Sequence, residues 1–267
     1  MSVLNRENEK AFVKKFKEIL LNEFKIQDRK GLYAKTQKVM AYNSNKIEGS
    51  TLNSEQTATL FDTGTLYASE DEVYKAKDIE EMNGHFRMFN HMLKTIDDQL
   101  SEKLIKEYHY NLKVGVFEDI LNGRPIGDYK NRANGVSDIT TYLPKEVPEA
   151  MSLLLEEYNN SPKNMDAIVK FHSDYEKIHP FQDGNGRTGR MIIFKQCIDI
   201  NIIPIIIKDD TKVKYYHALL AAQVEGNFKL LRTYFEEQQK EYYEMIKDYV
   251  EYSNMRIFDE SEYEQER

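Results

Sequence analysis

Cysteine, proline and long apolar runs are all scarce in this chain of 267 residues, and each scarcity excludes a class of structure. The one cysteine, Cys197, cannot form a disulfide framework or a cysteine-based zinc site, and its apolar neighbours indicate a buried thiol. The most apolar run, Ile202 to Ile207, is short and contains Pro204, so it cannot span a membrane. The polar first residues lack the apolar core of a signal peptide, and we therefore expect a cytoplasmic protein.

The chain also has fewer positively charged than negatively charged residues. The chain has 37 Lys and Arg against 45 Asp and Glu, which gives a net charge of −8 and a pI of about 5.4. A broad nucleic-acid surface needs a basic balance, so DNA or RNA is a poor expectation for the partner. A local basic pocket for ATP remains compatible with an acidic whole. The ordinary apolar content favours a soluble globular protein.

Apolar residues recur at three- and four-residue intervals along most of the chain, which is the periodicity of amphipathic helices. Gly49 is a candidate left-handed terminator, and Asn53 or Ser54 is a candidate cap for a short helix. The other predicted helices cover residues 6–28, 33–48, 69–93, 101–110, 148–159, 164–178, 186–201, 211–222 and 228–252. We therefore predict an all-α fold.

Residues 115–143 differ, because Gly and Asn cluster there as they do in loops. The stretch from Val136 to Leu143 is rich in β-branched and aromatic residues, and Pro144 follows it. This pattern predicts one small β-hairpin in the otherwise helical chain.

The stretch from His179 to Arg190, HPFQDGNGRTGR, combines a titratable base, a carboxylate, glycines and two arginines. It ends at the start of a predicted helix, where free N–H groups and the helix dipole favour an anion. Arg187 and Arg190 are three positions apart and can bind phosphate oxygens, while Asp183 is a ligand that Mg²⁺ prefers beside phosphates. A neutral His179 can accept a proton. A plain helix-capping turn needs neither the histidine nor the arginines.

These twelve residues resemble the signature of the Fic family, H-P-F-x-[D/E]-G-N-G-R-x-x-R, and match it at every fixed position. The resemblance covers about residues 70–235. It implies a Fic-type helical bundle that transfers AMP from ATP to a Ser, Thr or Tyr hydroxyl of a protein and releases pyrophosphate. By this resemblance His179 is the general base and Asp183 holds Mg²⁺. The residues that would bind ATP and its phosphates are Gly184, Asn185, Gly186, Arg187, Thr188, Gly189 and Arg190.

Two further matches are less specific. The predicted hairpin corresponds to the family's flap, which registers the target by β-augmentation, and the residues that would line it are Ile139, Thr140, Thr141 and Tyr142. Its sequence departs from the commoner Gly-His-x-x-Pro-Pro form, which leaves target choice open. Tyr215, Tyr216 and Gln223 resemble the adenine side of the pocket, although the same residues fit a core position equally well.

A second motif, from Ser44 to Gly49, resembles the family's inhibitory motif, [S/T]-x-x-x-E-[G/N]. Its key residues are Ser44, Glu48 and Gly49, although Ser and Glu four apart also occur on many solvated helices. The resemblance implies that Glu48 competes with the γ-phosphate for Arg190. It divides the chain into N-terminal helices over 1–69 with the inhibitory helix at about 33–49, a catalytic core over 70–235, and a helical extension over 236–267 packed on the same unit.

The resemblance therefore implies a protein adenylyltransferase restrained by Glu48, with Mg²⁺ as cofactor and ATP as co-substrate. The partner is a protein substrate, with self-modification left open, and no nucleic acid or membrane is expected. A homodimer is also left open by the tyrosine-rich C-terminus. Two other activities remain, removal of AMP from a modified protein and transfer of another phosphate-containing group. A different class, an inactive binding or antitoxin module, conflicts with the intact His179.

Overall fold

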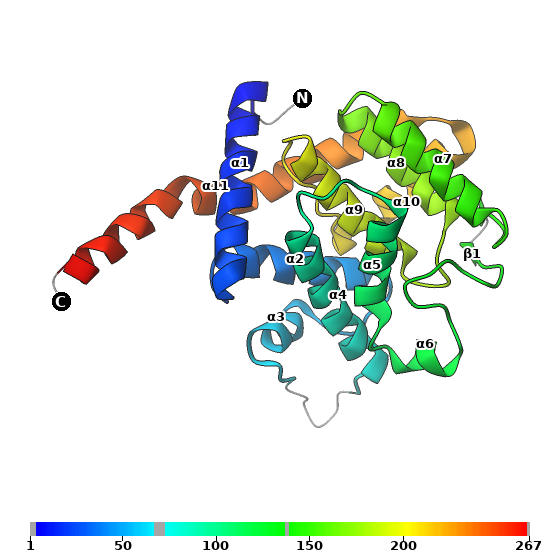
Figure 1. The fold of residues 1–267 in the computed structure, drawn as a ribbon, viewed down its shortest axis with the longest axis horizontal. Helices are drawn as coiled ribbons and strands as arrows, with labels where there is room; N and C mark the ends of the chain where they lie inside the picture. The colour runs from blue at the N-terminus through cyan, green and yellow to red at the C-terminus, as the bar shows by residue number, and fades with distance from the viewer. Residues whose placement is uncertain (1–3, 67–72, 137–138, 266–267) are drawn as a thin grey trace.

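The computed structural model describes residues 4–66, 73–136 and 139–265 of the chain, and helices dominate it (Figure 1). The helices are α1 (Arg6–Ile26), α2 (Leu32–Ile47), α3 (Ser54–Thr63), α4 (Ala76–Lys94), α5 (Glu102–Lys113), α6 (Phe117–Leu121), α7 (Val147–Asn160), α8 (Met165–Ile178), α9 (Asn185–Asp199), α10 (Lys212–Glu225) and α11 (Phe228–Gln265), with a 3₁₀ turn at Asp209–Thr211. The predicted all-α class is confirmed.

Helix α9 lies at the centre of the molecule, and α2, α4, α5 and α8 pack around it (Figure 1). From Arg187 to Ile198 every residue of α9 is buried. A helix that is covered on all sides must be apolar or have partners for its polar groups, and Arg187, Arg190 and Lys195 each have a partner on another part of the chain. Because Gly184 is the N-cap of this helix, the loop before it lies at the centre of the fold as well.

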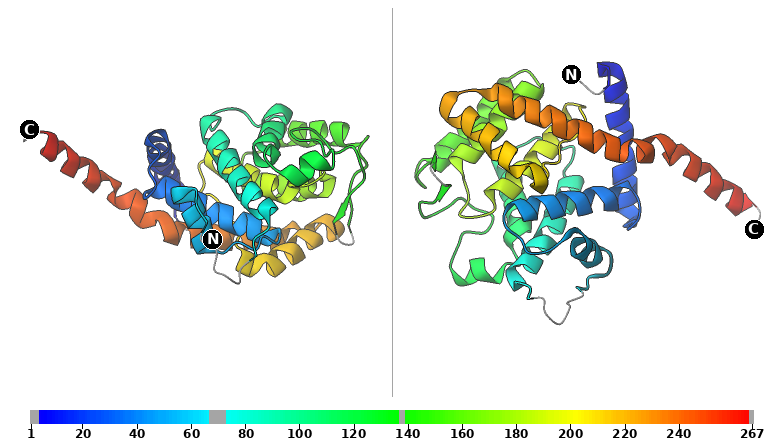
Figure 2. Two further views of the ribbon diagram at one scale, coloured as in Figure 1. Left: turned by 90° about the horizontal axis from the view of Figure 1, so that it is seen from below. Right: turned by 180° about the vertical axis from the view of Figure 1, so that it is seen from behind.

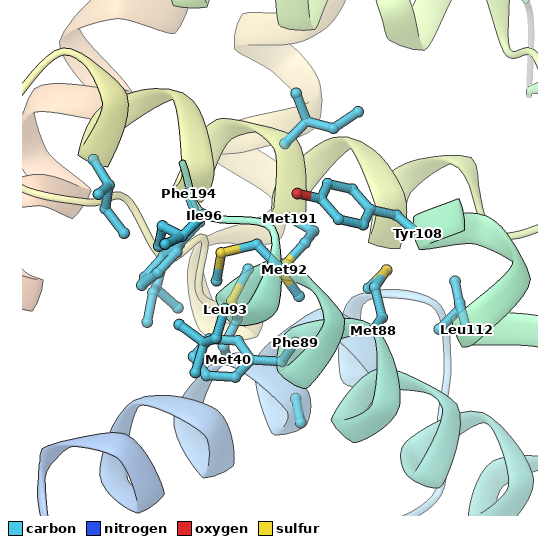
Figure 3. Close-up of a cluster of buried hydrophobic side chains, with 14 of the residues drawn as sticks. Met40, Met88, Phe89, Met92, Leu93, Ile96, Tyr108, Leu112, Met191 and Phe194 are labelled. Carbon is cyan, nitrogen blue, oxygen red and sulfur yellow. The ribbon is translucent and has the colours of Figure 1, made fainter. Parts of the chain in front are cut away.

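The core beside α9 is rich in methionine and aromatic side chains (Figure 3). Phe194 of α9 lies near Phe89 of α4 and Phe16 of α1, with ring centroids 5.9 and 6.4 Å apart. Flexible methionines fill the remaining gaps between helices of different direction, and they are Met40, Met88, Met92 and Met191. This packing fixes the depth of α9 and hence the position of its N-terminus.

A second buried cluster joins α8 and α9 to α10 and α11. Helix α11 crosses the molecule beside α1 and is attached to α2 by a buried hydrogen bond between Tyr242 Oη and Thr36 Oγ1, 2.8 Å long. Its C-terminal part then extends away from the other helices (Figures 1 and 2). None of the helices within the described ranges has both the length and the apolar character of a membrane span.

Some predicted boundaries are corrected. The helix predicted from residue 69 begins at Ala76, because Asp78, not the earlier acidic residues, occupies its first turn and accepts hydrogen bonds from Thr51. The predicted start itself lies outside the described residues. Helix α6 was not predicted, and α11 is a single helix to Gln265.

The β-structure among the described residues is a two-residue antiparallel pairing of β1 (Gly135–Val136) with β2 (Ile139–Thr140), in the register Gly135–Thr140 and Val136–Ile139. Residues 137 and 138 between the two lie outside the described residues. So short a pairing does not amount to a sheet layer, and the role of this segment as a flap stays a prediction.

Candidate active site

His179 is the C-cap of α8 and has a left-handed backbone, with φ 53° and ψ 61°. Pro180 prevents the helix from continuing, so the chain turns sharply at the histidine. Its Nδ1 lies 3.3 Å from the carbonyl oxygen of Glu176, which can only accept a hydrogen bond. The ring proton therefore belongs on Nδ1, and Nε2 keeps a lone pair. Burial, with the nearby charge of Lys130, lowers the His179 pKa to about 4, which keeps the ring neutral near pH 7.

The loop after His179 is held rigid by its own side chains. Asn185 Oδ1 accepts from the Phe181 N–H at 2.7 Å, and Asn185 Nδ2 donates to the Phe181 carbonyl at 2.8 Å. Phe181 is fully buried and stacks on His109 with ring centroids 3.9 Å apart. Gly184 has φ 85°, which its lack of a side chain permits. The Asn185 side chain thus maintains the loop shape, whereas phosphate binding by this residue stays a prediction.

His109 supports this loop from α5. Its Nε2 donates to the Asp183 carbonyl at 3.0 Å, and its Nδ1 accepts from the Gly127 N–H at 2.9 Å. Burial lowers the pKa of His109 to about 3, so the ring is neutral, with Nε2 as the donor and Nδ1 as the acceptor. His109 was not among the site residues predicted from the sequence, because a single histidine on a helix carries no local signal.

Arg190 is buried and is held by the C-terminal turn of α2. Its Nε donates to Ser44 Oγ, and its Nη2 donates to the Ser44 carbonyl, each at 2.9 Å. Nη2 also lies 2.7 Å from Glu48 Oε1. The pairing predicted between the two motifs is therefore present as a contact. Gly186 makes room for it, since a Cβ there would lie 2.4 Å from the same Glu48 oxygen.

Arg187 points to a different set of partners. Its Nη1 lies 2.6 Å from Glu81 Oε2, and its Nη2 lies 3.3 Å from Asp183 Oδ1. It also contacts Asn45 of α2. Glu81 was not expected to compete with phosphate for Arg187, because it lies on α4, far from the signature. Thr188 is fully buried, and Gly189 packs against Tyr175 and Glu176 of α8.

Asp183 belongs to an acidic cluster that could hold a metal ion. Its carboxylate oxygens and those of Glu81 and Asp119 lie within 4.8 Å of one another. Burial alone would raise the Asp183 pKa, but the charges of Arg187 and Lys113 outweigh it and hold the pKa far below the usual range. Asp183 is thus ionised, and a carboxylate beside an anion site is a ligand type that Mg²⁺ takes together with phosphate oxygens. Asp183 therefore fits the expected ion when phosphate oxygens supply further ligands.

An open cleft of about 600 Å³ leads to this cluster. Asp183, Arg187 and Glu48 line its inner side, and the α4 start contributes the basic residues Lys75 and Lys77. Phe117 of α6 borders it as well. Its lining holds six carboxylates, Glu48, Asp78, Glu80, Glu81, Glu118 and Asp183, against the three cations Lys75, Lys77 and Arg187. The part of the cleft suited to a phosphate group is therefore the α9 N-terminus with Arg187.

The predicted flap is connected to the signature loop by Lys130. Its Nζ donates to Asn134 Oδ1 at 2.7 Å and to Thr141 Oγ1 at 3.1 Å, and its backbone N–H donates to the Pro180 carbonyl at 2.9 Å. Thr141 is buried in these contacts, whereas Tyr142 is exposed. The side chains of Ile139 and Thr140 lie outside the described ones. Target docking by these four residues stays a prediction.

The predicted adenine residues differ in their surroundings. Tyr215 is buried, and its hydroxyl lies 2.7 Å from His172 Nε2, so it occupies a core position. Tyr216 is partly exposed beside it. Gln223 donates to the Ser173 carbonyl at 3.1 Å. A role in adenine binding stays a prediction for all three residues.

Comparisons with known proteins agree with this geometry. The family model described as "Fic/DOC family" matches residues 99–197. Protein adenylyltransferase fic-1 of Caenorhabditis elegans is 26% identical over 188 residues, which are 68% of this chain and 36% of that protein. Protein adenylyltransferase Fic of Drosophila willistoni is 28% identical over 198 residues, with 70% and 37% covered. The chain thus spans little more than a third of the length of these curated relatives.

Among solved structures, a Fic domain containing signaling protein from Bacteroides thetaiotaomicron is similar in fold. The TM-score is 0.74 at 23% sequence identity, and the match covers 91% of this chain and 97% of that one. At this identity the likeness concerns the fold, which is the all-α Fic type. The family match covers the signature loop, and the chain is distantly similar to Fic adenylyltransferases.

Proposed function

We propose that the protein transfers AMP from ATP to a hydroxyl side chain of a protein, and that Glu48 restrains this activity. The observation that carries the proposal is the short path from His179 to the α9 N-terminus. A neutral base, an anion site made of backbone N–H groups and an ionised carboxylate follow one another along a single rigid loop. The curated relatives named above are protein adenylyltransferases, which supports the same reaction.

In the proposed reaction the target hydroxyl oxygen attacks the α-phosphorus of ATP. The bond from that phosphorus to the pyrophosphate oxygen breaks, and the hydroxyl proton passes to Nε2 of His179. The N–H groups at the start of α9 stabilise the phosphate charge that develops. Magnesium would neutralise further phosphate charge when bound, and Asp183 is the residue that would hold it. The products are an AMP-protein ester and pyrophosphate.

Glu48 restrains the reaction by occupying Arg190. The Nε and Nη2 groups of Arg190 already contact Ser44 and Glu48, so these groups cannot bind a γ-phosphate at the same time. Arg190 is only 4% exposed, so it needs a charged or polar partner at all times. Restraint and ATP binding are therefore two competing partnerships of one buried cation.

Removal of AMP is a second candidate, favoured by the position of Glu48 on the cleft. Its side chain is 32% exposed and lines the cleft together with Asp183. A carboxylate there could orient a water molecule toward an AMP-protein bond. In that reaction water adds to the phosphorus and the protein hydroxyl leaves with a proton.

Incubation with labelled ATP and Mg²⁺ tests both candidates. We expect Glu48→Gly to label protein at least tenfold more than wild type, and His179→Ala to lose labelling by about 10²-fold or more. His217→Ala, which changes an exposed histidine, is the matched control. Mass spectrometry identifies the transferred group, and equal labelling by His179→Ala and wild type would contradict the proposal. Wild type that strips AMP from protein labelled by Glu48→Gly, while Glu48→Gln does not, supports removal.

A further inference from the structure

The acidic cluster already contains a cation of the protein itself. Lys113, the last residue of α5, is almost fully buried. Its Nζ lies 2.6 Å from Glu81 Oε1 and 2.5 Å from Asp119 Oδ2. The third carboxylate, Asp183 Oδ2, is 2.8 Å away. An ammonium has three N–H donors, so one lysine can serve all three carboxylates.

The charges of this cluster balance without a metal. Each carboxylate that contacts Lys113 also contacts an arginine: Glu81 and Asp183 contact Arg187, and Asp119 contacts Arg124 at 2.6 Å. Three carboxylates therefore face three cations, Lys113, Arg124 and Arg187. Lys77 also lies 3.9 Å from Asp183 Oδ2, but Glu118 offsets its charge at 3.4 Å, so the cluster carries no net charge. A divalent ion needs an excess of negative charge to offset the loss of its water shell.

The Nζ atom of Lys113 lies where an ion bound by the three carboxylates would lie. Its distances to the three oxygens, 2.5 to 2.8 Å, are close to the calcium–oxygen distances of about 2.3 to 2.6 Å. Glu81 and Asp119 have side chains only 10% and 1% exposed, whereas Asp183 is 30% exposed. An ion that arrives through the cleft therefore meets Asp183, while the other two carboxylates are already taken by the ammonium.

We propose that Lys113 is the resident cation of this cluster and the positioning residue for Asp183. It fills the place of a metal among the three carboxylates, so the free protein binds no divalent cation there. An ion reaches Asp183 only together with nucleotide phosphates, which bring the missing negative charge. The role of nucleotide phosphates rests on the proposed adenylyltransferase function. The place of Lys113 among the carboxylates and the lack of divalent-cation binding by the free protein do not rest on it.

Thermal unfolding without nucleotide tests the proposal. Lys113→Met removes the ammonium and leaves three carboxylates facing one another. We expect its Tm to fall by about 10 °C in EDTA, and millimolar Ca²⁺ or Mn²⁺ to restore several degrees. Wild type should show the same Tm with and without these ions. A merely structural lysine would lower the Tm without any gain from the ions.

Lys195→Met is the matched control. Lys195 is an equally buried lysine, but the carboxylate it contacts is Asp199, and its other partner is the Ile96 carbonyl. Its loss should lower the Tm with no ion-dependent recovery, because one carboxylate cannot hold an ion.

Calorimetric titration of wild type with Ca²⁺ and Mn²⁺ keeps the proposal testable if Lys113→Met does not fold. No binding tighter than about 1 mM supports it. Submillimolar binding that Asp119→Asn abolishes would overturn the proposal. A folded Lys113→Met protein whose Tm does not change with either ion would overturn it as well. Neither measurement involves AMP transfer, so a failure here is distinct from a failure of the proposed function.

Discussion

Arg190 Nη2 lies 2.7 Å from Glu48 Oε1, although the two residues are 142 positions apart in the sequence. Ser44, one turn before Glu48 on α2, adds two hydrogen bonds to the same guanidinium. The end of α2 is therefore attached to the first turns of α9 through Arg190, and Arg187 adds a longer contact to Asn45. Displacing α2 from this position requires another anionic partner for Arg190, and phosphate is such a partner.

Ser44→Ala should partly release the proposed restraint. It removes the hydrogen bond from Arg190 Nε but keeps the Ser44 carbonyl contact and the ion pair with Glu48. Loss of one hydrogen bond is worth about 1 kcal/mol, so AMP transfer should rise about fivefold, less than for Glu48→Gly. Initial rates of labelling measure this. Ser50→Ala, whose hydroxyl accepts from the Leu52 N–H, should change nothing; a Ser44→Ala rate equal to wild type would exclude Ser44 from the restraint.

Most of the helices and the signature loop could be predicted, because their signals are local. Asn53 and Ser101 accept hydrogen bonds at the helix starts that they mark, and Gly49 has the expected positive φ of 89°. The His179 to Arg190 stretch owes its identification to twelve consecutive residues. Caps, glycines and short motifs depend on near neighbours in the chain, so they can be recognised without the fold.

The supports of the site could not be predicted in the same way. Glu81, Lys113 and Asp119 lie on three helices, and each reads as an ordinary charged residue in its own segment. They meet because α4 and α5 pack very closely, so closely that a Cβ on Gly84 would lie 1.9 Å from the Leu112 carbonyl oxygen. Arg187 was expected to face phosphate, but this packing brings Glu81 within 2.6 Å of it. Such contacts follow from tertiary structure and leave no periodic trace in the sequence.

His109→Phe should loosen the signature loop. Phenylalanine keeps the stacking on Phe181 but leaves the Asp183 carbonyl and the Gly127 N–H without their present partner. We expect a loss of about 2 to 3 kcal/mol in the free energy of unfolding, measured in urea, and a lower rate of AMP transfer. His91→Gln, which changes a partly exposed pair with Glu107, should cost less than about 1 kcal/mol. A His109→Phe protein within 0.5 kcal/mol of wild type would show that the loop does not depend on this ring.

Glu176 should give the stability of the protein a recognisable pH dependence. Its carboxyl group lies beneath Gly189 near Arg190, and burial raises its pKa from 4.5 to about 8, with Arg190 opposing and Glu48 adding to the shift. Between pH 4.5 and 8 the folded protein keeps this proton while the unfolded chain releases it. The free energy of unfolding therefore falls as pH rises through this window, and the contribution is gone above pH 8. Glu176→Gln keeps a neutral group at every pH, so relative to wild type it should gain about 3 to 4 kcal/mol between pH 5 and 8. Urea unfolding at a series of pH values measures the difference, in which the contributions of the buried histidines cancel.

The control is Glu156→Gln on the exposed face of α7, whose free energy of unfolding should follow that of wild type at every pH. Parallel curves for Glu176→Gln and wild type would mean that Glu176 is ionised in the folded protein.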